Sequence, residues 1–110
     1  MPRDPKVLLD DMLDAIGRIE SYTGGFKPES LNDPRTLDAV IRNLEVLGEA
    51  AKAVPQDTRD RLAGVEWKKI AAFRDVLIHQ YFGVDTSIVA DVVASKLPGI
   101  KEVLARELGC

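Results

Sequence analysis

Apolar residues recur at helical spacing along most of the chain. After Asp4-Pro5, a first helix is predicted by four apolar residues that follow three or four positions apart: Leu8, Met12, Ala15 and Ile19. A carboxylate followed by proline is typical of a helix start, because the carboxylate caps free amide groups and proline has no amide hydrogen to satisfy. The pattern ends at Thr23-Gly24-Gly25, and a loop is expected to continue from Pro28 to Asp33.

The second predicted helix has the longest apolar stripe in the chain. Asp33-Pro34 repeats the start signal, and the stripe then covers about five turns: Leu37, Val40, Ile41, Leu44, Leu47, Ala51 and Val54. Arg42 and Glu49 lie on the opposite face, as in a helix that covers a core on one side. Pro55 closes this helix, and the polar stretch 55–66 has room for one short helical turn.

The remainder of the chain also has helical spacing. A helix is expected from about Glu66 to Tyr81, with large apolar residues on one side: Trp67, Ile70, Phe73, Leu77 and Tyr81. Asp85-Thr86-Ser87 caps a further helix, in which helical spacing and the cap outweigh the strand preference of its valines. Pro98 either kinks this helix or starts another. Because no alternating run is present, the predicted fold is all-α: an antiparallel bundle of four or five helices, in one domain over residues 1–110.

Composition agrees with a folded globular domain. The chain has 110 residues, of which 45% are hydrophobic and 30% are charged. No apolar run approaches the roughly 20 residues of a membrane span, and the N-terminus lacks a secretory pattern. The single cysteine, Cys110, excludes an internal disulfide and a multi-cysteine zinc site. We therefore expect a soluble cytoplasmic protein that does not associate with a membrane.

The net charge of the chain bears on which macromolecules it can bind. A net charge of −3 argues against binding a nucleic acid duplex over a broad surface, since such proteins are usually basic. Residues 59–79 nevertheless carry five basic and three acidic side chains, so a local basic site is compatible with the sequence.

The only histidine lies in a segment that combines polar with apolar residues, Arg74 to Tyr81, with the sequence RDVLIHQY. On a helix, Asp75 and His79 are one turn apart and close enough to touch. Arg74 and Tyr81 face the same way, whereas Arg74 and His79 are separated by about 140° around the axis. Arg74 and His79 therefore meet only if the long arginine side chain reaches round, or if they come from two protomers of a dimer.

These residue types suit the cleavage of a phosphodiester bond in RNA. Histidine gives or takes a proton near neutral pH, and arginine binds phosphate through two hydrogen bonds. The 2′-hydroxyl of RNA is an internal nucleophile, so this chemistry needs no metal ion. Asp75 could hold the imidazole, and Tyr81 offers a hydroxyl.

Structural explanations for the same residues stay open at this point. A histidine near the end of a helix is often a partner of the helix dipole, and Arg74 with Asp75 could be a surface ion pair. Tyr81 and Trp67 could both be core aromatics. Three aspartates of the first helix, Asp10, Asp11 and Asp14, are interpreted as a solvated face and not as a metal site.

The same segment resembles the signature of HepT-like toxins in the HEPN superfamily. Arg74, four residues, His79, one residue and Tyr81 match that signature, and further blocks extend the resemblance: AVIRNLEVLGEA at 39–50, WKKIAAFR at 67–74, YFGVD at 81–85, and Leu97-Pro98. The resemblance implies an all-α homodimer with the motif helices at the interface. It also implies metal-independent ribonuclease activity without a cofactor, with Arg74 and His79 as the catalytic residues.

The resemblance implies a partner as well. HepT-like toxins are usually neutralised by a small nucleotidyltransferase antitoxin, which in some members transfers AMP to the tyrosine of the motif, here Tyr81. One departure is visible, because many members have asparagine where this chain has Asp75. Aspartate places a negative charge beside the expected phosphate site and could lower activity.

Two functional hypotheses follow. The first is a dimeric, metal-independent endoribonuclease toxin that acts on RNA and is neutralised by a nucleotidyltransferase. The second is a non-catalytic dimeric helical partner that only accepts AMP from such an enzyme. The net charge and Asp75 favour the second, but Arg74, His79 and Tyr81 are all present, and we adopt the first.

Overall fold

The protein is described by a computed structural model that covers residues 3–79 and 83–109. Tyr81 and Cys110 lie outside these ranges. The described residues form helices and no strand, which confirms the predicted all-α fold. The elements in chain order are α1 (Pro5–Tyr22), the 3₁₀ helix η1 (Pro28–Asn32), α2 (Pro34–Ala53), α3 (Gln56–Arg61), α4 (Trp67–His79), α5 (Thr86–Asp91), the π-helical turn η2 (Val92–Lys96) and α6 (Leu97–Leu108).

The helix starts follow the predicted capping signals. The carboxylate of Asp4 accepts a hydrogen bond from the backbone amide of Lys6 at 2.9 Å. Asp33 does the same for Arg35 at 3.1 Å, and Asp85 for Ser87 at 2.9 Å. The predicted short turn after Pro55 is α3.

The segment between α1 and α2 is more ordered than the loop that the sequence predicted. Gly24, Gly25 and Phe26 all have positive φ angles, of 62°, 96° and 66°. The buried Thr23 hydroxyl donates to the carbonyl of Ile19 and accepts from the amide of Phe26. The chain then forms η1, because Pro28 suits the first turn of a helix and Leu31 packs into the core.

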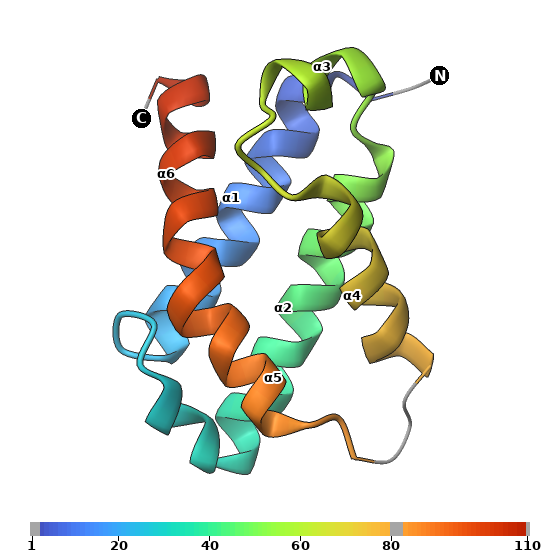
Figure 1. The fold of residues 1–110 in the computed structure, drawn as a ribbon. Coiled ribbons are helices and arrows are strands. Elements are labelled where there is room, and N and C mark those ends of the chain that lie inside the picture. Colours follow the sequence, from blue (N-terminus) through green and yellow to red (C-terminus); the bar gives the residue numbers. More distant parts are fainter. Residues whose placement is uncertain (1–2, 80–82, 110) are drawn as a thin grey trace.

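Pro98 does not interrupt the last helix. The backbone remains helical from α5 through η2 into α6, and the rod runs continuously from orange to red in Figure 1. Pro98 has no amide hydrogen for the carbonyl of Ala94. The helix adjusts just before it, where the amide of Leu97 donates to Val92, five residues back.

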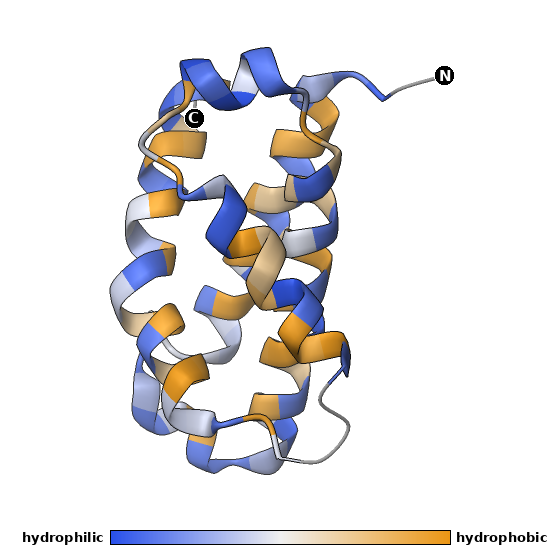
Figure 2. Cartoon of the chain, turned by 45° about the vertical axis from the view of Figure 1, so that its right-hand side comes forward, coloured by the Kyte–Doolittle hydropathy of each residue, from blue (hydrophilic) through white to orange (hydrophobic). Residues whose placement is uncertain are grey.

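The core lies between the antiparallel long helices α1, α2 and α4 and the continuous helix from α5 to α6 (Figure 1). α1 packs against α2 and α6, while α4 packs against α2. Figure 2 shows the hydrophobic residues gathered on the inward sides of the helices. The largest fully buried apolar side chains come from α1, α2 and the helix from α5 to α6, and not from α4: Met12, Ile16, Ile19, Val40, Val89, Val93, Leu97 and Leu104. Trp67 is buried too, and its indole donates to the carbonyl of Leu62 at 3.0 Å, so it is a core residue.

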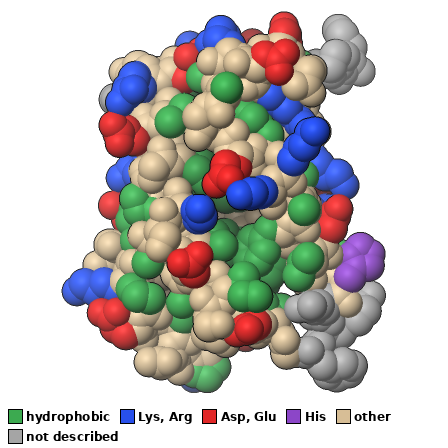
Figure 3. Space-filling view, in the orientation of Figure 1, with side chains coloured by type: hydrophobic (Ala, Val, Ile, Leu, Met, Phe, Trp, Pro, Cys, Tyr) green, Lys and Arg blue, Asp and Glu red, His purple; other side chains and the backbone are tan. Residues whose placement is uncertain are grey.

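α4 lies at the margin of the bundle. A largely apolar groove of about 450 Å³ separates it from η2 and α6, and ion pairs of Glu66 with Lys69 and Lys96 lie at its mouth. Charged side chains and an apolar area gather on this face in Figure 3. Within the described ranges, none of the helices is both long and apolar enough to cross a membrane.

Candidate functional site

α4 meets α2 most closely at Gly48 and Arg74. A Cβ atom added to Gly48 would lie 2.3 Å from the Cβ of Arg74 and 2.8 Å from its Cγ. No real side chain tolerates such distances, so the stem of Arg74 occupies the space that the glycine leaves free. The absence of a side chain at Gly48 therefore allows Arg74 to lie against α2.

Arg74 is mostly buried, and not all of its guanidinium donors form hydrogen bonds. Its side chain is 24% exposed, and its NH1 lies 3.3 Å from the Oδ1 of Asp75. Its Nε is buried and has no hydrogen-bond partner among the described residues. A buried donor without an acceptor costs free energy, so such a group in a native structure calls for an explanation. An anionic ligand that accepts from the guanidinium would supply one.

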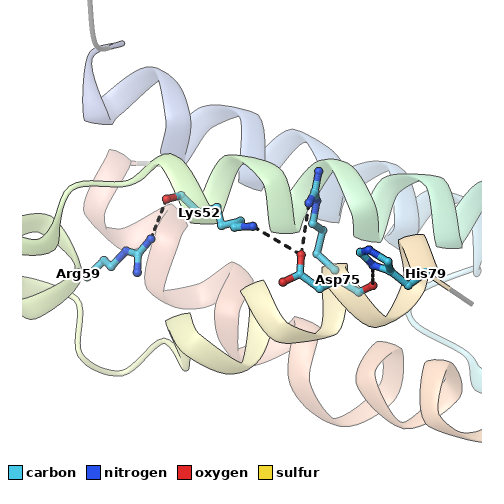
Figure 4. A network of polar contacts seen from close by, with 5 residues as sticks. Lys52, Arg59, Asp75 and His79 are labelled. Atoms are coloured by element: carbon cyan, nitrogen blue, oxygen red, sulfur yellow. Dashed lines mark hydrogen bonds and ion pairs between the residues drawn. The ribbon is translucent and has the colours of Figure 1, made fainter.

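The carboxylate of Asp75 lies between two cations from different helices. Its Oδ1 contacts the NH1 of Arg74 on α4 and, at 3.5 Å, the Nζ of Lys52 on α2 (Figure 4). The hydrogen bond from Arg74, with the charge of Lys52, holds the pKa of the Asp75 carboxyl below its usual range. Asp75 is therefore an ionised counterion at neutral pH.

His79 is exposed at the last position of α4. Its Nδ1 lies 2.8 Å from the backbone carbonyl oxygen of Asp75, as the dashed line in Figure 4 shows. Because a carbonyl oxygen only accepts, this contact assigns the proton of the neutral imidazole to Nδ1. The Nε2 atom is then left with a lone pair that can take a proton from a substrate.

The suggestion that Asp75 holds the imidazole needs a correction. The contact to His79 comes from the backbone carbonyl of Asp75, whereas the carboxylate contacts Arg74 and Lys52. A carbonyl oxygen has two lone pairs, so that of Asp75 can accept from the imidazole in addition to its hydrogen bond within the helix. The Asp75 side chain therefore contacts Arg74 and does not contact the imidazole through its carboxylate.

No hydrogen bond joins the side chains of Arg74 and His79 in the described chain. The Arg74 stem lies against α2 at Gly48, while His79 is exposed at the C-terminal end of α4. The ion pair that the sequence suggested between Arg74 and Asp75 is present, but Arg74 is not a simple surface residue. Tyr81, the expected AMP acceptor, lies outside the described residues.

Lys52 and Arg59 belong to the same polar network, and sequence analysis did not single them out. The Arg59 guanidinium donates to three carbonyls at the end of α2: Ala51 at 3.0 Å, Lys52 at 2.9 Å and Val54 at 2.9 Å. An arginine soon after a helix end can cap the last carbonyls, and this signal was available in the sequence. No local signal pointed from Lys52 to Asp75.

One of the acidic residues of α1 is paired with a basic side chain. Asp11 is paired with Arg3 at 2.9 Å, in line with a solvated face. Over residues 3–79 and 83–109, no three His, Cys, Asp or Glu side chains gather closely enough to hold a metal ion.

Comparison with known proteins places this chain among ribonucleases. A family model described as ribonuclease HepT-like matches residues 12–107. A Methanocaldococcus jannaschii protein named "Putative RNase" is 42% identical over 106 residues, which are 94% of this chain and 88% of that protein. A Thermococcus cleftensis protein named "Probable ribonuclease HepT" is 40% identical over 102 residues, which are 92% and 93% of the two chains.

A longer relative matches over only part of its length. A second M. jannaschii protein, named "Gamma-glutamylcyclotransferase and putative RNase", is 37% identical over 107 residues. The match takes in 96% of this chain and 48% of that protein, so this chain spans about half of its length. No solved structure matches the chain.

Proposed function

The chain belongs to the ribonuclease HepT-like family, and we propose that it is a metal-independent endoribonuclease toxin whose catalytic residues are Arg74 and His79. One observation carries the assignment of these residues. The Nε–H of a mostly buried arginine has no acceptor among the described residues, and the exposed histidine on the same helix has its Nδ1 bound by a backbone carbonyl. The arginine guanidinium suits the binding of an anion, and the histidine imidazole suits the transfer of a proton.

The proposed reaction is an internal transfer within the RNA. The Arg74 guanidinium binds the non-bridging oxygens of the phosphate and stabilises the charge that grows there. Nε2 of His79 takes the proton of the 2′-hydroxyl, whose oxygen attacks phosphorus. The bond from phosphorus to the 5′-oxygen breaks, and that oxygen receives a proton from a protonated imidazole. The products are a 2′,3′-cyclic phosphate and a free 5′-hydroxyl.

A homodimer would bring the two catalytic groups together. No hydrogen bond joins Arg74 and His79 within one described chain, so we propose that Arg74 of one protomer works with His79 of another. The outer face of α4 supports this arrangement, because Val76 is 45% exposed there and Ala72, one turn earlier, is exposed as well. An apolar strip beside His79 suits the contact between two copies of α4.

We propose a nucleotidyltransferase antitoxin as the partner, on the resemblance of the motif from Arg74 to Tyr81. Transfer of AMP to Tyr81, two residues after His79, would place an anion near Arg74 and repel the phosphates of RNA. Because RNA is the proposed substrate, we also propose that the protein acts in the cytoplasm.

The non-catalytic alternative is favoured by one observation. The carboxylate of Asp75 already contacts the guanidinium of Arg74, and an occupied guanidinium binds phosphate less well. In that case the protein would serve only as the dimeric partner and AMP acceptor of the nucleotidyltransferase. An RNA cleavage assay separates the two functions.

The assay uses purified protein, total cellular RNA and an excess of EDTA. The wild type should cleave, whereas His79→Ala and Arg74→Ala should lose at least about a hundredfold in rate, as expected for removal of a proton-transfer or charge-stabilising group. Both variants should keep the helical circular dichroism of the wild type. Arg74→Lys keeps the charge but loses the paired donors, and should recover only part of the activity.

Three results would contradict the proposal. A wild type that does not cleave RNA would favour the non-catalytic alternative. Complete inhibition by EDTA would exclude the metal-independent reaction. Loss of helicity in His79→Ala would indicate a structural role for this residue.

A further inference from the structure

We propose that Lys52 is a second phosphate-binding residue of the site, an inference that rests on the proposed ribonuclease function. In the free protein, the carboxylate of Asp75 would occupy the position that a phosphate oxygen takes when RNA binds. The substrate class is thus a polyanion whose phosphate contacts α2 and α4 at once.

The convergence of two cations on one oxygen carries this inference. Nζ of Lys52 and NH1 of Arg74 lie 3.5 Å and 3.3 Å from the same Oδ1 atom of Asp75. Well-formed hydrogen bonds between charged groups are shorter, at about 2.7–2.9 Å, so neither cation is tightly paired. A phosphodiester group has two non-bridging oxygens and could engage both cations.

The fold holds Lys52 beside Arg74 through α2. Lys52 follows Gly48 by one helical turn, so it lies on the same side of α2, and the close approach at Gly48 brings α4 within its reach. Arg59 fixes the backbone here, because its guanidinium bonds the carbonyls of Ala51, Lys52 and Val54.

Arg59 also improves the electrostatics of the site for an anion. The C-terminal end of a helix carries partial negative charge, which would repel a phosphate near Lys52. The Arg59 guanidinium lies on the carbonyls that carry this charge and offsets it. Since the side chain of Lys52 is about half exposed, RNA can reach it.

A surface ion pair between Lys52 and Asp75 would be the simplest alternative. Exposed pairs of this kind contribute little to stability. In that case Lys52 would take no part in the binding of RNA. The two explanations differ in what happens to RNA affinity when Lys52 loses its charge.

The test measures the binding of a short fluorescein-labelled single-stranded RNA whose 2′-hydroxyls are methylated, so that it cannot be cleaved. Lys52→Gln should bind about tenfold more weakly at low salt, and the slope of log Kd against log salt should become shallower by about one unit. Lys52→Arg should keep both values. In cleavage of unmodified RNA, Lys52→Gln should raise KM and leave kcat close to that of the wild type.

Lys101→Gln is the matched control. Lys101 is 41% exposed, compared with 49% for Lys52, and it also forms one ion pair, with Glu20 at 2.6 Å. Both variants lose one positive charge and one ion pair. Lys101 belongs to α6, outside the proposed site, so Lys101→Gln should bind RNA as the wild type does.

An Asp75→Asn background shows whether Lys52 acts directly. If Lys52 contacts RNA directly, Lys52→Gln should still weaken RNA binding about tenfold when it is added to Asp75→Asn. If the effect of Lys52→Gln vanishes in this background, Lys52 acts only through Asp75 and the inference is wrong.

The outcomes separate this inference from the proposed function. If the wild type cleaves RNA but Lys52→Gln binds as Lys101→Gln does, Lys52 is not a phosphate ligand and the ribonuclease assignment stands. A wild type that neither binds nor cleaves RNA would overturn both. Circular dichroism of Lys52→Gln and Lys52→Arg confirms that each variant is folded.

Discussion

Gly48 and Arg74 are in such close contact that a Cβ on the glycine would lie 2.3 Å from the Cβ of the arginine. Glycine in the middle of a helix normally weakens it, because its backbone loses more freedom on folding. Here that cost is offset by the packing of α4 against α2. The same contact holds the catalytic candidate Arg74 in a mostly buried position, so one residue links the stability of the fold to the geometry of the site.

Gly48→Ala should therefore destabilise the protein, although alanine is the better helix former. The added methyl group must displace the stem of Arg74 or separate α2 from α4, and overpacking of this kind costs roughly 1–3 kcal/mol or more. The gain in helix propensity offsets only about 1 kcal/mol of this. Denaturant unfolding monitored by circular dichroism measures the difference, and cleavage activity should fall as well.

Gly17→Ala is the control for that substitution. Gly17 lies in α1, and a Cβ added there would meet nothing within 4 Å. Its replacement should stabilise the protein by about 0.5–1 kcal/mol through helix propensity alone. Equal effects of the two substitutions would show that the close contact at Gly48 is of no consequence.

Asp75→Asn should tighten the binding of RNA near neutral pH. In the proposed site, the carboxylate that contacts Arg74 and Lys52 competes with phosphate, and asparagine removes its charge while keeping its shape. The dissociation constant of the non-cleavable RNA should fall several-fold, as expected for loss of one repulsive charge near the ligand. An unchanged or larger dissociation constant would contradict the competition between Asp75 and phosphate.

The ion pairs of Asp75 also predict a dependence of stability on pH. Arg74 and Lys52 lower the pKa of this carboxyl below its usual value of about 3.9, so its contribution to stability is complete above that pH. The contribution is lost as the pH falls through the lowered pKa. The unfolding midpoints of wild type and Asp75→Asn should thus differ at neutral pH and converge in acid; a constant difference would exclude this linkage.

The protein should be a dimer through the outer face of α4. Light scattering at micromolar concentration should give twice the mass of the chain, and Val76→Glu should give a folded monomer, because it buries a charge in the apolar contact. Val7→Glu on α1 is the matched control, since Val7 is 40% exposed and Val76 is 45% exposed. A monomeric wild type, or a dimer that survives Val76→Glu, would argue against the shared site.

Tyr81 should accept AMP from the cognate nucleotidyltransferase. Intact-mass spectrometry after incubation with that enzyme and ATP should show added AMP units on the wild type and none on Tyr81→Phe. Tyr22 is the only other tyrosine and is 46% exposed, so Tyr22→Phe serves as the control and should be modified normally. Equal modification of Tyr81→Phe would move the assignment to another residue.

The helices and their starts could be predicted because the signals for them are local. Asp4, Asp33 and Asp85 each cap an amide two residues ahead, and this bond needs nothing from the rest of the fold. The turn before Pro98 was harder to predict. The lack of an amide hydrogen at proline can end a helix, or the helix can continue through a π turn. The packing of the flanking residues decides which of the two occurs. Here Val93 and Leu97 are both fully buried, and the helix continues.

Arg74 and His79 could be found from their spacing and from the family that the motif resembles, since residue type and order carry that information. The residues that surround Arg74 and His79 in space could not be found in this way, because the tertiary structure decides them. Lys52 and Gly48 are more than twenty positions from Asp75 and Arg74, and only the crossing of α2 and α4 makes them neighbours. The carboxylate of Asp75 faces these cations because attraction to two positive charges outweighs any contact with a histidine one turn away. The chain thus encodes its helices and reactive groups locally, whereas the helix crossing decides which charges share a site.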